Sequence, residues 1–442
     1  MKHLAAFVAV VFAVTSLIFG QGSLTPPGSP APTMKTLEQV EPRTPITNLP
    51  VTISQPGSYY VTTNLTGSPS GITIAADGVT LDLMGFELVG GGGGAGVSVS
   101  GVRTNIAIRN GRLRNWSWGV LAQSAFSGIF EHLQANANGF SGILVGSNSI
   151  IRSCIARSNV AGIGIFAGQG STVKDCVAQG SSIGSGKGIW VGEGSTVSGC
   201  AVQSNGTGIQ AEPGSTIKDC TALGSTFYGI QLAHGCTVAN STVAGSGSDG
   251  ILAASGCTIQ DCTVVSNGNY GVNSTGAGTI RGCTARSNTA GGINAGSGSL
   301  VKDCQAADNN GDGIVANGSA ISGCVAKGNV GDGIEVNSNC LVADNTCEGN
   351  GAGAGNGAAI HVTGGANRID NNQSTASDRG IDVDGTLNLI IRNSCSSNTT
   401  NYDIAANNYL APTLIPPLSG ALIGDSGGSG TFTNHPWANF SY

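Results

Sequence analysis

Three ionisable side chains, one from each of three successive repeats, carry the strongest signal for chemistry in this sequence: Glu335, His361 and Asp382. Each follows the isoleucine of a recurrent Gly-Ile or Ala-Ile step, so that strands paired in register would hold them about 5 Å apart per step. Carboxylates at that distance can share a proton or hold a cation, and they raise the pKa of an imidazole between them. We interpret the three as candidate catalytic residues, with Asp384 as a candidate ligand contact on the same face. The alternative is a solvated polar surface.

A second group of side chains combines flat apolar rings with hydrogen-bonding groups: Phe166, Trp190, Gln210, Glu212 and Gln231. The apolar face of a sugar ring packs against aromatic rings, and amides or carboxylates hydrogen-bond its hydroxyl groups. We therefore interpret these residues as a candidate polysaccharide-binding site. The alternative is an aromatic pair covered by the insert around residues 180–187.

Short strands must position both groups. From residue 142 to 404 the Gly-Ile type step recurs, mostly every 20 or 21 residues, with a second apolar strand between steps. This period is too short for a propeller blade and lacks the Leu-rich horseshoe consensus. It predicts an all-β chain, a right-handed parallel β-helix of about fourteen coils with N- and C-terminal caps. Along each Gly-Ile strand the isoleucine points inward and the next residue outward.

The segments outside the repeat divide the chain. Residues 1–20 have a charged start and an apolar run, which is typical of a signal peptide. Residues 21–47 form a Pro-rich linker and N-terminal segment, residues 48–404 the β-helix, and residues 405–442 a C-terminal cap or tail. Within the β-helix, we expect residues 48–70 to cap the first coil.

Several segments resemble a known superfamily. The stretches GVTLDLMGFELVG at 78–90 and IAIRNGRL at 106–113, with the repeated N-G-x-G-I, look like coils of pectin-lyase-like right-handed β-helix proteins. The start of the chain, KTLEQVEPRTPI at 35–46 and TISQPGSYYVTTNLTG at 52–67, is similar to secreted bacterial β-helix proteins of no established activity. The resemblance implies that the strand after each Gly-Ile step lines a polysaccharide groove. The calcium-binding carboxylates of the lyases and the paired Asp motifs of the hydrolases have no match here, because the middle coils carry Leu252, Asn273, Asn294 and Val315.

Thirteen cysteines and a series of asparagines recur at fixed positions of the repeat. One position of the repeat is cysteine in most successive repeats, and Ser241 and Asn345 replace cysteine at that position. These replacements favour a stacked, inward-facing corner over a metal ligand. In an oxidising compartment we expect a disulfide between Cys236 and Cys257, which lie one repeat apart. No CxxC pair or His-Cys cluster indicates a metal site. The asparagines precede the Gly-Ile steps, and we interpret them as a corner ladder that uses the tolerance of Asn for left-handed backbone: Asn159, Asn205, Asn267, Asn288, Asn309, Asn329 and Asn350.

Composition limits the classes of function. The net charge is −6 and the basic residues form no stripe, so the sequence lacks the positive surface that is typical of a nucleic-acid-binding protein. The apolar run at residues 4–19 is short for a membrane span, so we expect a secreted or periplasmic protein without cofactor and leave its oligomeric state open. The first hypothesis is a structural or carbohydrate-binding surface protein. The alternatives are a polysaccharide lyase or glycoside hydrolase, and a metal-handling β-helix, which five His and three Met support poorly.

Overall fold

The computed structural model describes residues 42–181, 186–351, 357–414 and 436–442. The expected signal peptide and most of the expected linker lie outside these residues. The chain divides into two units, Met1–Arg43 and Thr44–Tyr442, and the second contains the repeats. Every regular element of the described residues is a β-strand, and none of those residues forms a helix that could cross a bilayer.

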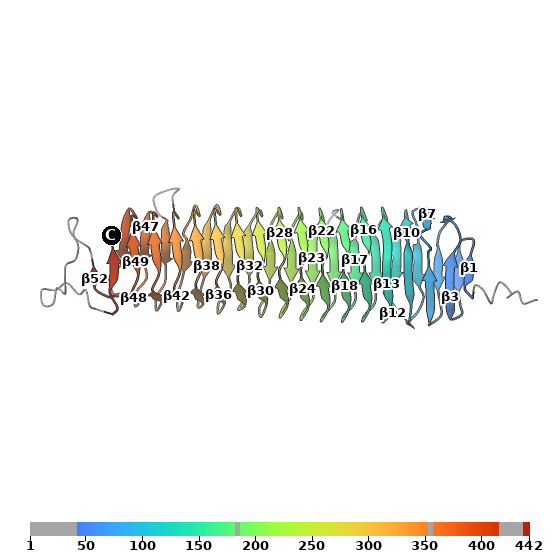
Figure 1. Ribbon diagram of the computed structural model, residues 1–442, viewed down its shortest axis with the longest axis horizontal. Helices are drawn as coiled ribbons and strands as arrows, with labels where there is room; N and C mark the ends of the chain where they lie inside the picture. The colour runs from blue at the N-terminus through green and yellow to red at the C-terminus, as the bar shows by residue number, and fades with distance from the viewer. Residues whose placement is uncertain (1–41, 182–185, 352–356, 415–435) are drawn as a thin grey trace, which may run out of the picture. The chain divides into compact units, whose positions relative to one another are not determined.

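The repeats of the second unit wind into a parallel β-helix whose turns stack from β1 (Thr44–Ile46) to β52 (Thr413–Leu414) (Figure 1). One ladder, here called the Gly-Ile sheet, takes one strand from each turn. In the described residues its strands are β2 (Val51–Ile53), β5 (Ile72–Ile74), β8 (Ala95–Val99), β11 (Trp118–Ala122), β14 (Ser141–Val145), β17 (Ile163–Ala167), β20 (Lys187–Val191), β23 (Thr207–Ala211), β26 (Ile230–Leu232), β29 (Ile251–Ala253), β32 (Tyr270–Ser274), β35 (Gly291–Ala295), β38 (Asp312–Ala316), β41 (Ile334–Val336), β44 (Ala358–Val362), β47 (Arg379–Val383) and β50 (Thr400–Ile404).

Two further ladders complete each turn on the other faces. In one repeat they are represented by β24 (Thr216–Lys218) and β25 (Thr221–Leu223), which pair with β27 (Thr237–Ala239) and β28 (Thr242–Ala244) of the next repeat. The described part of the β-helix has about seventeen turns, so the expectation of about fourteen was too low. The additional turns are N-terminal. Residues 48–70, expected as a cap, form a complete turn with β2, β3 (Gly57–Val61) and β4 (Leu65–Gly67), because the less regular spacing there conceals the same alternation.

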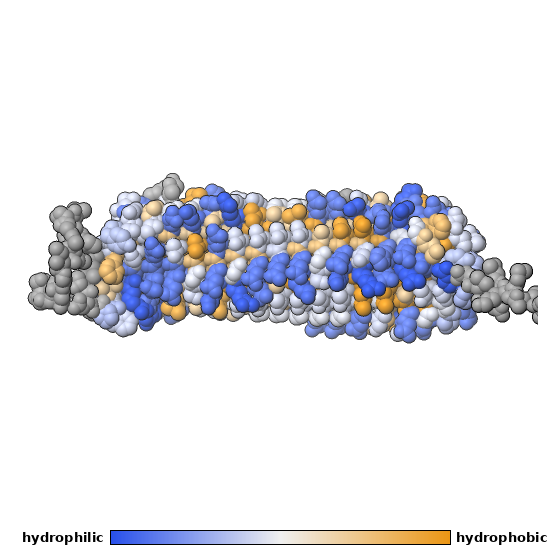
Figure 2. Space-filling view, in the orientation of Figure 1, coloured by the Kyte–Doolittle hydropathy of each residue, from blue (hydrophilic) through white to orange (hydrophobic). Residues whose placement is uncertain are grey.

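Stacked aliphatic side chains fill the interior, since one turn alone cannot bury its apolar face. The step residues of twelve consecutive turns are fully buried: Ile143, Ile165, Ile189, Ile209, Ile230, Ile251, Val272, Ile293, Ile314, Ile334, Ile360 and Ile381. Because side chains stack in register, like residues form bands along the column (Figure 2).

The register corrects the sequence prediction at two places. In β17 the step residue is Ile165, which pairs with Ile143 and Ile189, whereas Ile163 pairs with Lys187. Near the C-terminal end, Tyr402 pairs with Ile381, while Ile404 pairs with Val383. In each case two apolar residues stand two positions apart in the sequence. The alternation of inward and outward side chains does not show which of the two is the step residue.

The asparagine ladder forms, but for a different reason from the one expected. The backbone N–H and the side-chain amide of Asn288 both donate to Oδ1 of Asn309, each at 3.0 Å. The left-handed backbone falls on the preceding residue, as at Ser287, whose φ is 55°. The asparagines are therefore selected for satisfying buried backbone groups at the corner and not for their own conformation.

The cysteine column lies inside, as expected. The backbone N–H of Cys220 donates to Oγ of Ser241, and that of Cys324 donates to Oδ1 of Asn345, so hydroxyl and amide oxygens replace sulfur at this corner. All thirteen cysteines are buried free thiols in the structure. Cys236 and Cys257 lie on successive turns and donate to separate backbone carbonyls. Their pairing remains a prediction for the oxidised protein.

The described parts of residues 405–442 continue the ladders of the other faces. Strand β51 (Tyr409–Leu410) pairs with β48 (Leu389–Ile391), and β53 (Asn439–Ser441) pairs with β49 (Ser394–Ser396). This segment therefore adds hydrogen bonds to the last turns of the β-helix.

Candidate functional site

The predicted Glu335, His361 and Asp382 come together on neighbouring strands. Glu335 of β41 pairs in register with His361 of β44, which pairs with Asp382 of β47. The longer repeat between Glu335 and His361 is thus a single turn with an insertion. Part of this insertion, residues 352–356, lies outside the described residues.

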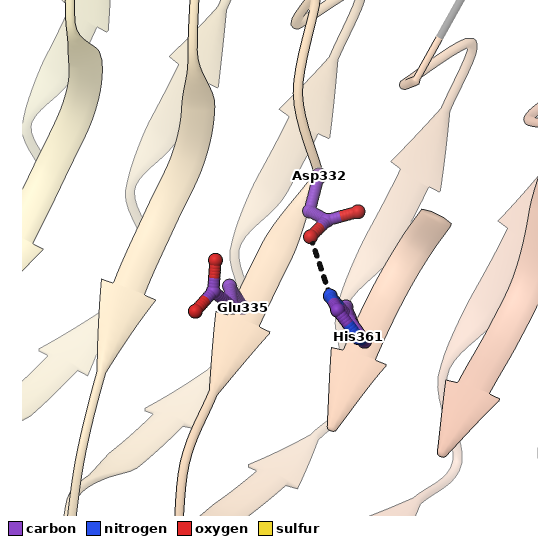
Figure 3. Close-up of side chains that lie close together, drawn as sticks. All are labelled: Asp332, Glu335 and His361. Atoms are coloured by element: carbon purple, nitrogen blue, oxygen red, sulfur yellow. Dashed lines mark hydrogen bonds and ion pairs between the residues drawn. The ribbon is translucent and has the colours of Figure 1, made fainter. Parts of the chain in front are cut away.

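His361 is held between two carboxylates, Asp332 and Asp384. Its Nδ1 lies 2.8 Å from Oδ2 of Asp332, and its Nε2 lies 3.2 Å from Oδ2 of Asp384. Figure 3 shows the Asp332 carboxylate, just before β41, directed at the imidazole on the next strand, with Glu335 on β41 itself. Asp332 is buried and also accepts a hydrogen bond from the backbone N–H of Ala358. Asp332 is itself held in place, so its hydrogen bond fixes the orientation of the imidazole.

The pKa of His361 is raised to about 9, chiefly by its hydrogen bond to Asp332, against the opposing effect of burial. Asp384 and Asp382 raise it further. The direction agrees with the sequence prediction, but its principal cause is Asp332, which was not among the predicted site residues. At neutral pH the imidazole is cationic.

Asp382 forms an ion pair with Arg379 and is almost fully buried. Its Oδ2 lies 2.7 Å from Nη1 of Arg379, and the side chain is 5% exposed. Burial raises the pKa of Asp382, and the guanidinium opposes that effect. Arg379 also lies 3.2 Å from Asp403 on β50. The ion pair and the burial keep Asp382 away from solvent, so of the three predicted catalytic residues it is the least available to a ligand.

Glu335 lies among other acids. Its pKa is raised by burial and by the nearby Asp312 and Asp332 carboxylates. Burial also raises the pKa of Asp312, which accepts a hydrogen bond from the backbone N–H of Asp332 at 2.8 Å. Asp312 and Asp332 each stand two residues before a buried isoleucine in successive repeats, the same position as Arg379. That repeated placement was the sequence signal that could have identified them.

Two overlapping sets of side chains have donor atoms close enough to surround a cation. In Asp332, Glu335 and His361, and in His361, Asp382 and Asp384, the ligand atoms lie within 4.8 Å of one another. Both sets depend on His361, whose raised pKa keeps a proton on the imidazole at neutral pH. That proton opposes coordination of a metal ion.

The aromatic and amide residues predicted as a binding site form a second connected group. The rings of Phe166 and Trp190 meet edge to face, with centroids 5.1 Å apart. Trp190 Nε1 donates to Oε1 of Glu212 at 2.9 Å, and Gln210 Nε2 donates to the same oxygen at 3.1 Å. The register places Phe166 in the same outward row as Trp190, one row away from its expected position. Lys187 at the end of the insert lies 4.2 Å from the Trp190 ring centroid, so part of that ring is covered.

Beside this group, strands β23, β26 and β29 carry an open cleft of about 250 Å³. Gln210, Glu212 and Gln231, three of the five predicted residues, line it. Phe166 and Trp190 do not, and Trp190 contributes by fixing Glu212. The full lining is Gln210, Ala211, Glu212, Gln231, Leu232, Ala233, Leu252, Ala254 and Thr275. The His361 cluster lies farther along the same sheet, so the predicted residues form two groups and not one site.

The sequence matches the family model for the right-handed β-helix region at residues 95–243 and 233–374, which together exceed half of the chain. The chain belongs to the right-handed β-helix family. Similar structures include the A-module of a mannuronan C-5 epimerase from Azotobacter vinelandii, 13% identical over 76% of this chain and 91% of that one, with a TM-score of 0.45. An alginate lyase from Paenibacillus is 16% identical over 56% of this chain and 93% of that one, with a TM-score of 0.37.

A tailspike protein of an E. coli bacteriophage, in complex with a pentasaccharide, is 13% identical over 75% of this chain and 72% of that one, with a TM-score of 0.44. No curated protein matches the sequence.

Proposed function

We propose that this right-handed β-helix protein binds a polysaccharide along the outward face of the Gly-Ile sheet. The observation that carries the proposal is the cleft of about 250 Å³ over β23, β26 and β29. Its surface combines the apolar side chains of Leu252, Ala233 and Ala254 with the amides of Gln210 and Gln231. A sugar ring has the complementary pattern of an apolar face and a polar rim.

The polar groups of the cleft are oriented before any ligand arrives. Glu212 accepts hydrogen bonds from both Trp190 and Gln210, which fixes its carboxylate and the Gln210 amide. Binding sites held in this way lose less conformational entropy on binding. The remaining hydrogen-bonding capacity of Glu212 and the amide of Gln231 can then meet hydroxyl groups.

Beyond the cleft, the outward row of Gln210, Gln231 and Leu252 continues with Asn273 and Asn294. This continuation favours an extended ligand. Asn294 Nδ2 donates to Oδ1 of Asn273, and Asn273 Nδ2 donates to Asp249, each at 3.0 Å. These amides lie on successive strands between the cleft and Glu335. Parallel strands present such groups at a regular spacing of about 4.8 Å, so a chain of sugar residues can contact several turns.

The proposal is tested by titrating the purified full-length protein with a panel of oligosaccharides. The variant Gln231→Ala removes one amide of the cleft and is expected to weaken binding about tenfold, the effect of one or two lost hydrogen bonds. The matched control is Gln203→Ala, because Gln203 is an exposed glutamine on β22 (Ala201–Gln203), on another face of a neighbouring turn. Absence of binding to any oligosaccharide, or equal effects of the two variants, contradicts the proposal.

The second candidate function is polysaccharide cleavage, as a lyase or glycoside hydrolase, at the His361 cluster. The specific observation in its favour is the 2.8 Å contact between His361 Nδ1 and the buried Asp332. A carboxylate on one imidazole nitrogen orients the ring and leaves the other nitrogen to exchange a proton with a ligand. Here His361 Nε2 lies 3.2 Å from the exposed Asp384, so that carboxylate would have to move aside before the protonated ring could act as an acid on a ligand.

Cleavage is tested by incubating each bound oligosaccharide with the protein and measuring new reducing ends and ultraviolet absorbance from unsaturated products. A His361→Gln variant that binds but forms no product supports cleavage. A parent protein that binds glycans without product formation leaves binding as the function and rejects the enzyme.

We propose that the protein acts outside the cytoplasm, on the basis of the charged start and apolar run of residues 1–20. Mass spectrometry of the protein from culture medium or periplasm is expected to find the mature chain without this segment. Retention of the full chain in the cytoplasm contradicts the proposal.

A further inference from the structure

Two adjacent outward rows of side chains line the cleft over β23, β26 and β29, and the chemistry of the cleft changes along them. In the first row, Gln210, Gln231 and Leu252 pair in register on successive strands. The second row stands two residues farther along each turn and consists of Glu212, Ala233, Ala254 and Thr275. The cleft therefore has polar side chains at one end and small or apolar side chains at the other.

The polar end offers a ligand one carboxylate oxygen and one amide. Oε1 of Glu212 accepts hydrogen bonds from Trp190 and Gln210, at 2.9 and 3.1 Å, while its Oε2 receives none from a described residue. The side chain of Gln231 is half-buried and forms no hydrogen bond with a described residue. An oxygen that only accepts thus stands beside an amide that both donates and accepts.

The other end of the cleft is a small apolar hollow. Ala233 and Ala254 are half-buried there, and their side chains end at Cβ. Leu252 of the first row adds an aliphatic wall. The hydroxyl of Thr275 is already used, because its Oγ1 donates to the backbone carbonyl of Ala253 at 3.3 Å. The hollow therefore suits a methyl group better than a hydroxyl group.

We propose that the sugar bound in this cleft carries an N-acetyl group, so that the ligand is a polysaccharide of N-acetylated amino sugars. The inference rests on the proposed function, since it names the substrate class of the same cleft. An acetamido N–H donates to Oε2 of Glu212, and the acetamido carbonyl accepts from the amide of Gln231. The methyl group then packs against Ala233 and Ala254.

Charge argues against an acidic polysaccharide in the same place. Among the described residues that line the cleft, Glu212 is the only one that carries a charge. A sugar carboxylate therefore meets a like charge and no cation there, which is unfavourable. A sugar with a hydroxyl in place of the acetamido group leaves the hollow unfilled and the amide of Gln231 without its acceptor.

The experiment compares oligosaccharides of equal length and linkage in calorimetric titrations with the full-length protein: oligomers of N-acetylglucosamine, glucosamine and glucose. The N-acetylglucosamine oligomer is expected to bind at least about tenfold tighter than the glucose oligomer, because a buried methyl group and an added hydrogen bond each contribute a factor of about four or five. The glucosamine oligomer lacks the carbonyl and the methyl group, so it is expected to bind more weakly than the acetylated one.

Two variants test the two parts of the contact separately. Ala254→Val fills the hollow and Gln231→Glu removes the amide donor, and each is expected to reduce the preference for the acetylated oligomer over the glucose oligomer to about twofold. The matched controls are Ala244→Val, at a half-buried alanine at the end of β28, and Gln203→Glu, at the exposed glutamine of β22. Both controls lie on other faces and are expected to keep the full preference.

Equal binding of the acetylated and glucose oligomers, or tighter binding of the glucosamine oligomer, overturns the inference but leaves polysaccharide binding standing. A full preference that persists in both cleft variants also overturns it. If Ala254→Val fails to fold, Gln231→Glu still decides, since it changes a half-buried side chain without changing its size. Failure of all three oligomers and of the wider panel rejects the proposed function itself.

Discussion

The Nδ1 atom of His361 lies 2.8 Å from a carboxylate oxygen of Asp332, although the two residues belong to successive turns of the β-helix. Asp332 is placed by the corner before β41 and His361 by the middle of β44, so the contact exists because the intervening long repeat remains a single turn. The pair therefore reports both on the register of the stack and on the electrostatics of the cluster.

The first prediction concerns the titration of His361. In the parent protein its NMR resonance is expected to titrate with a pKa of about 9, above the ordinary value of 6.5, because Asp332 stabilises the imidazolium. Asp332→Asn is expected to lower that pKa by more than Glu335→Gln does. The exposed His234, whose ring contacts Ser255, is the internal control.

The pair also gives a pH dependence of stability. Because the pKa of His361 is raised on folding, its contribution is fully present below about pH 6.5 and is lost as the pH rises through about 9. Thermal unfolding of the parent between these pH values is expected to show a loss of stability that is smaller in the Asp332→Asn variant. A His361 pKa near 6.5, or identical pH profiles for parent and variant, contradicts the ion pair.

The second prediction concerns the stacked core. Ile293→Asp places a charge where the side chain is fully buried, and is expected to destabilise the fold by about 4 kcal/mol or more. Leu300 is exposed on β36 (Leu300–Lys302), so Leu300→Asp is the matched control, with an expected effect of at most about 1 kcal/mol. The measurement is the denaturation midpoint of both variants, and similar midpoints show that the assigned register is wrong.

The third prediction concerns the asparagine ladder. Asn309→Ala removes the oxygen that accepts from the backbone and side chain of Asn288, and leaves buried donors without a partner. A loss of about 2 to 4 kcal/mol in the free energy of unfolding is expected. Asn310 is exposed, so Asn310→Ala is expected to have little effect. Comparable losses in the two variants argue against the ladder as a source of stability.

The fourth prediction concerns oxidation. In protein recovered from an oxidising compartment, Cys236 and Cys257 are expected to form a disulfide, because parallel strands hold their Cα atoms about 4.8 Å apart. Proteolysis under non-reducing conditions followed by peptide mass mapping identifies the cross-linked peptide. Free thiols at both positions in that protein reject the pairing.

The fold could be predicted because the same residue types recur at the same positions of each repeat. The Gly-Ile step, the inward cysteine column and the asparagine corners recur often enough to define the β-helix, and the paired residues Glu335, His361 and Asp382 follow from the period alone. The N-terminal turns were missed because β2 lacks the Gly-Ile step and the steps that follow it, Gly71-Ile72, Gly96-Val97 and Gly119-Val120, are separated by 25 and 23 residues in place of 20 or 21. Where two apolar residues stand two positions apart, as at Ile163 and Ile165, alternation does not choose between them.

The candidate site was predictable only in part, because partners at the corners depend on backbone geometry. The strand pattern says which side chains face outward, but Asp332 reaches His361 from the corner, before alternation begins. Likewise, Asp382 is outward by position yet buried beneath Arg379. The cleft residues Leu252, Ala254 and Thr275 stand one or three residues after a step residue, at outward positions, but small or apolar side chains give no sign in the sequence of a cleft between them.

Glycan titration of the full-length protein and its Ala233→Trp variant tests the central claim most directly. The added indole fills the cleft over β26 without removing any polar group, and is expected to weaken binding of the preferred oligosaccharide at least about tenfold. Ala201→Trp, at an exposed alanine of β22 on another face, is expected to leave binding unchanged. Binding that survives in Ala233→Trp, or a parent protein that binds no oligosaccharide, contradicts a polysaccharide-binding role for the Gly-Ile sheet.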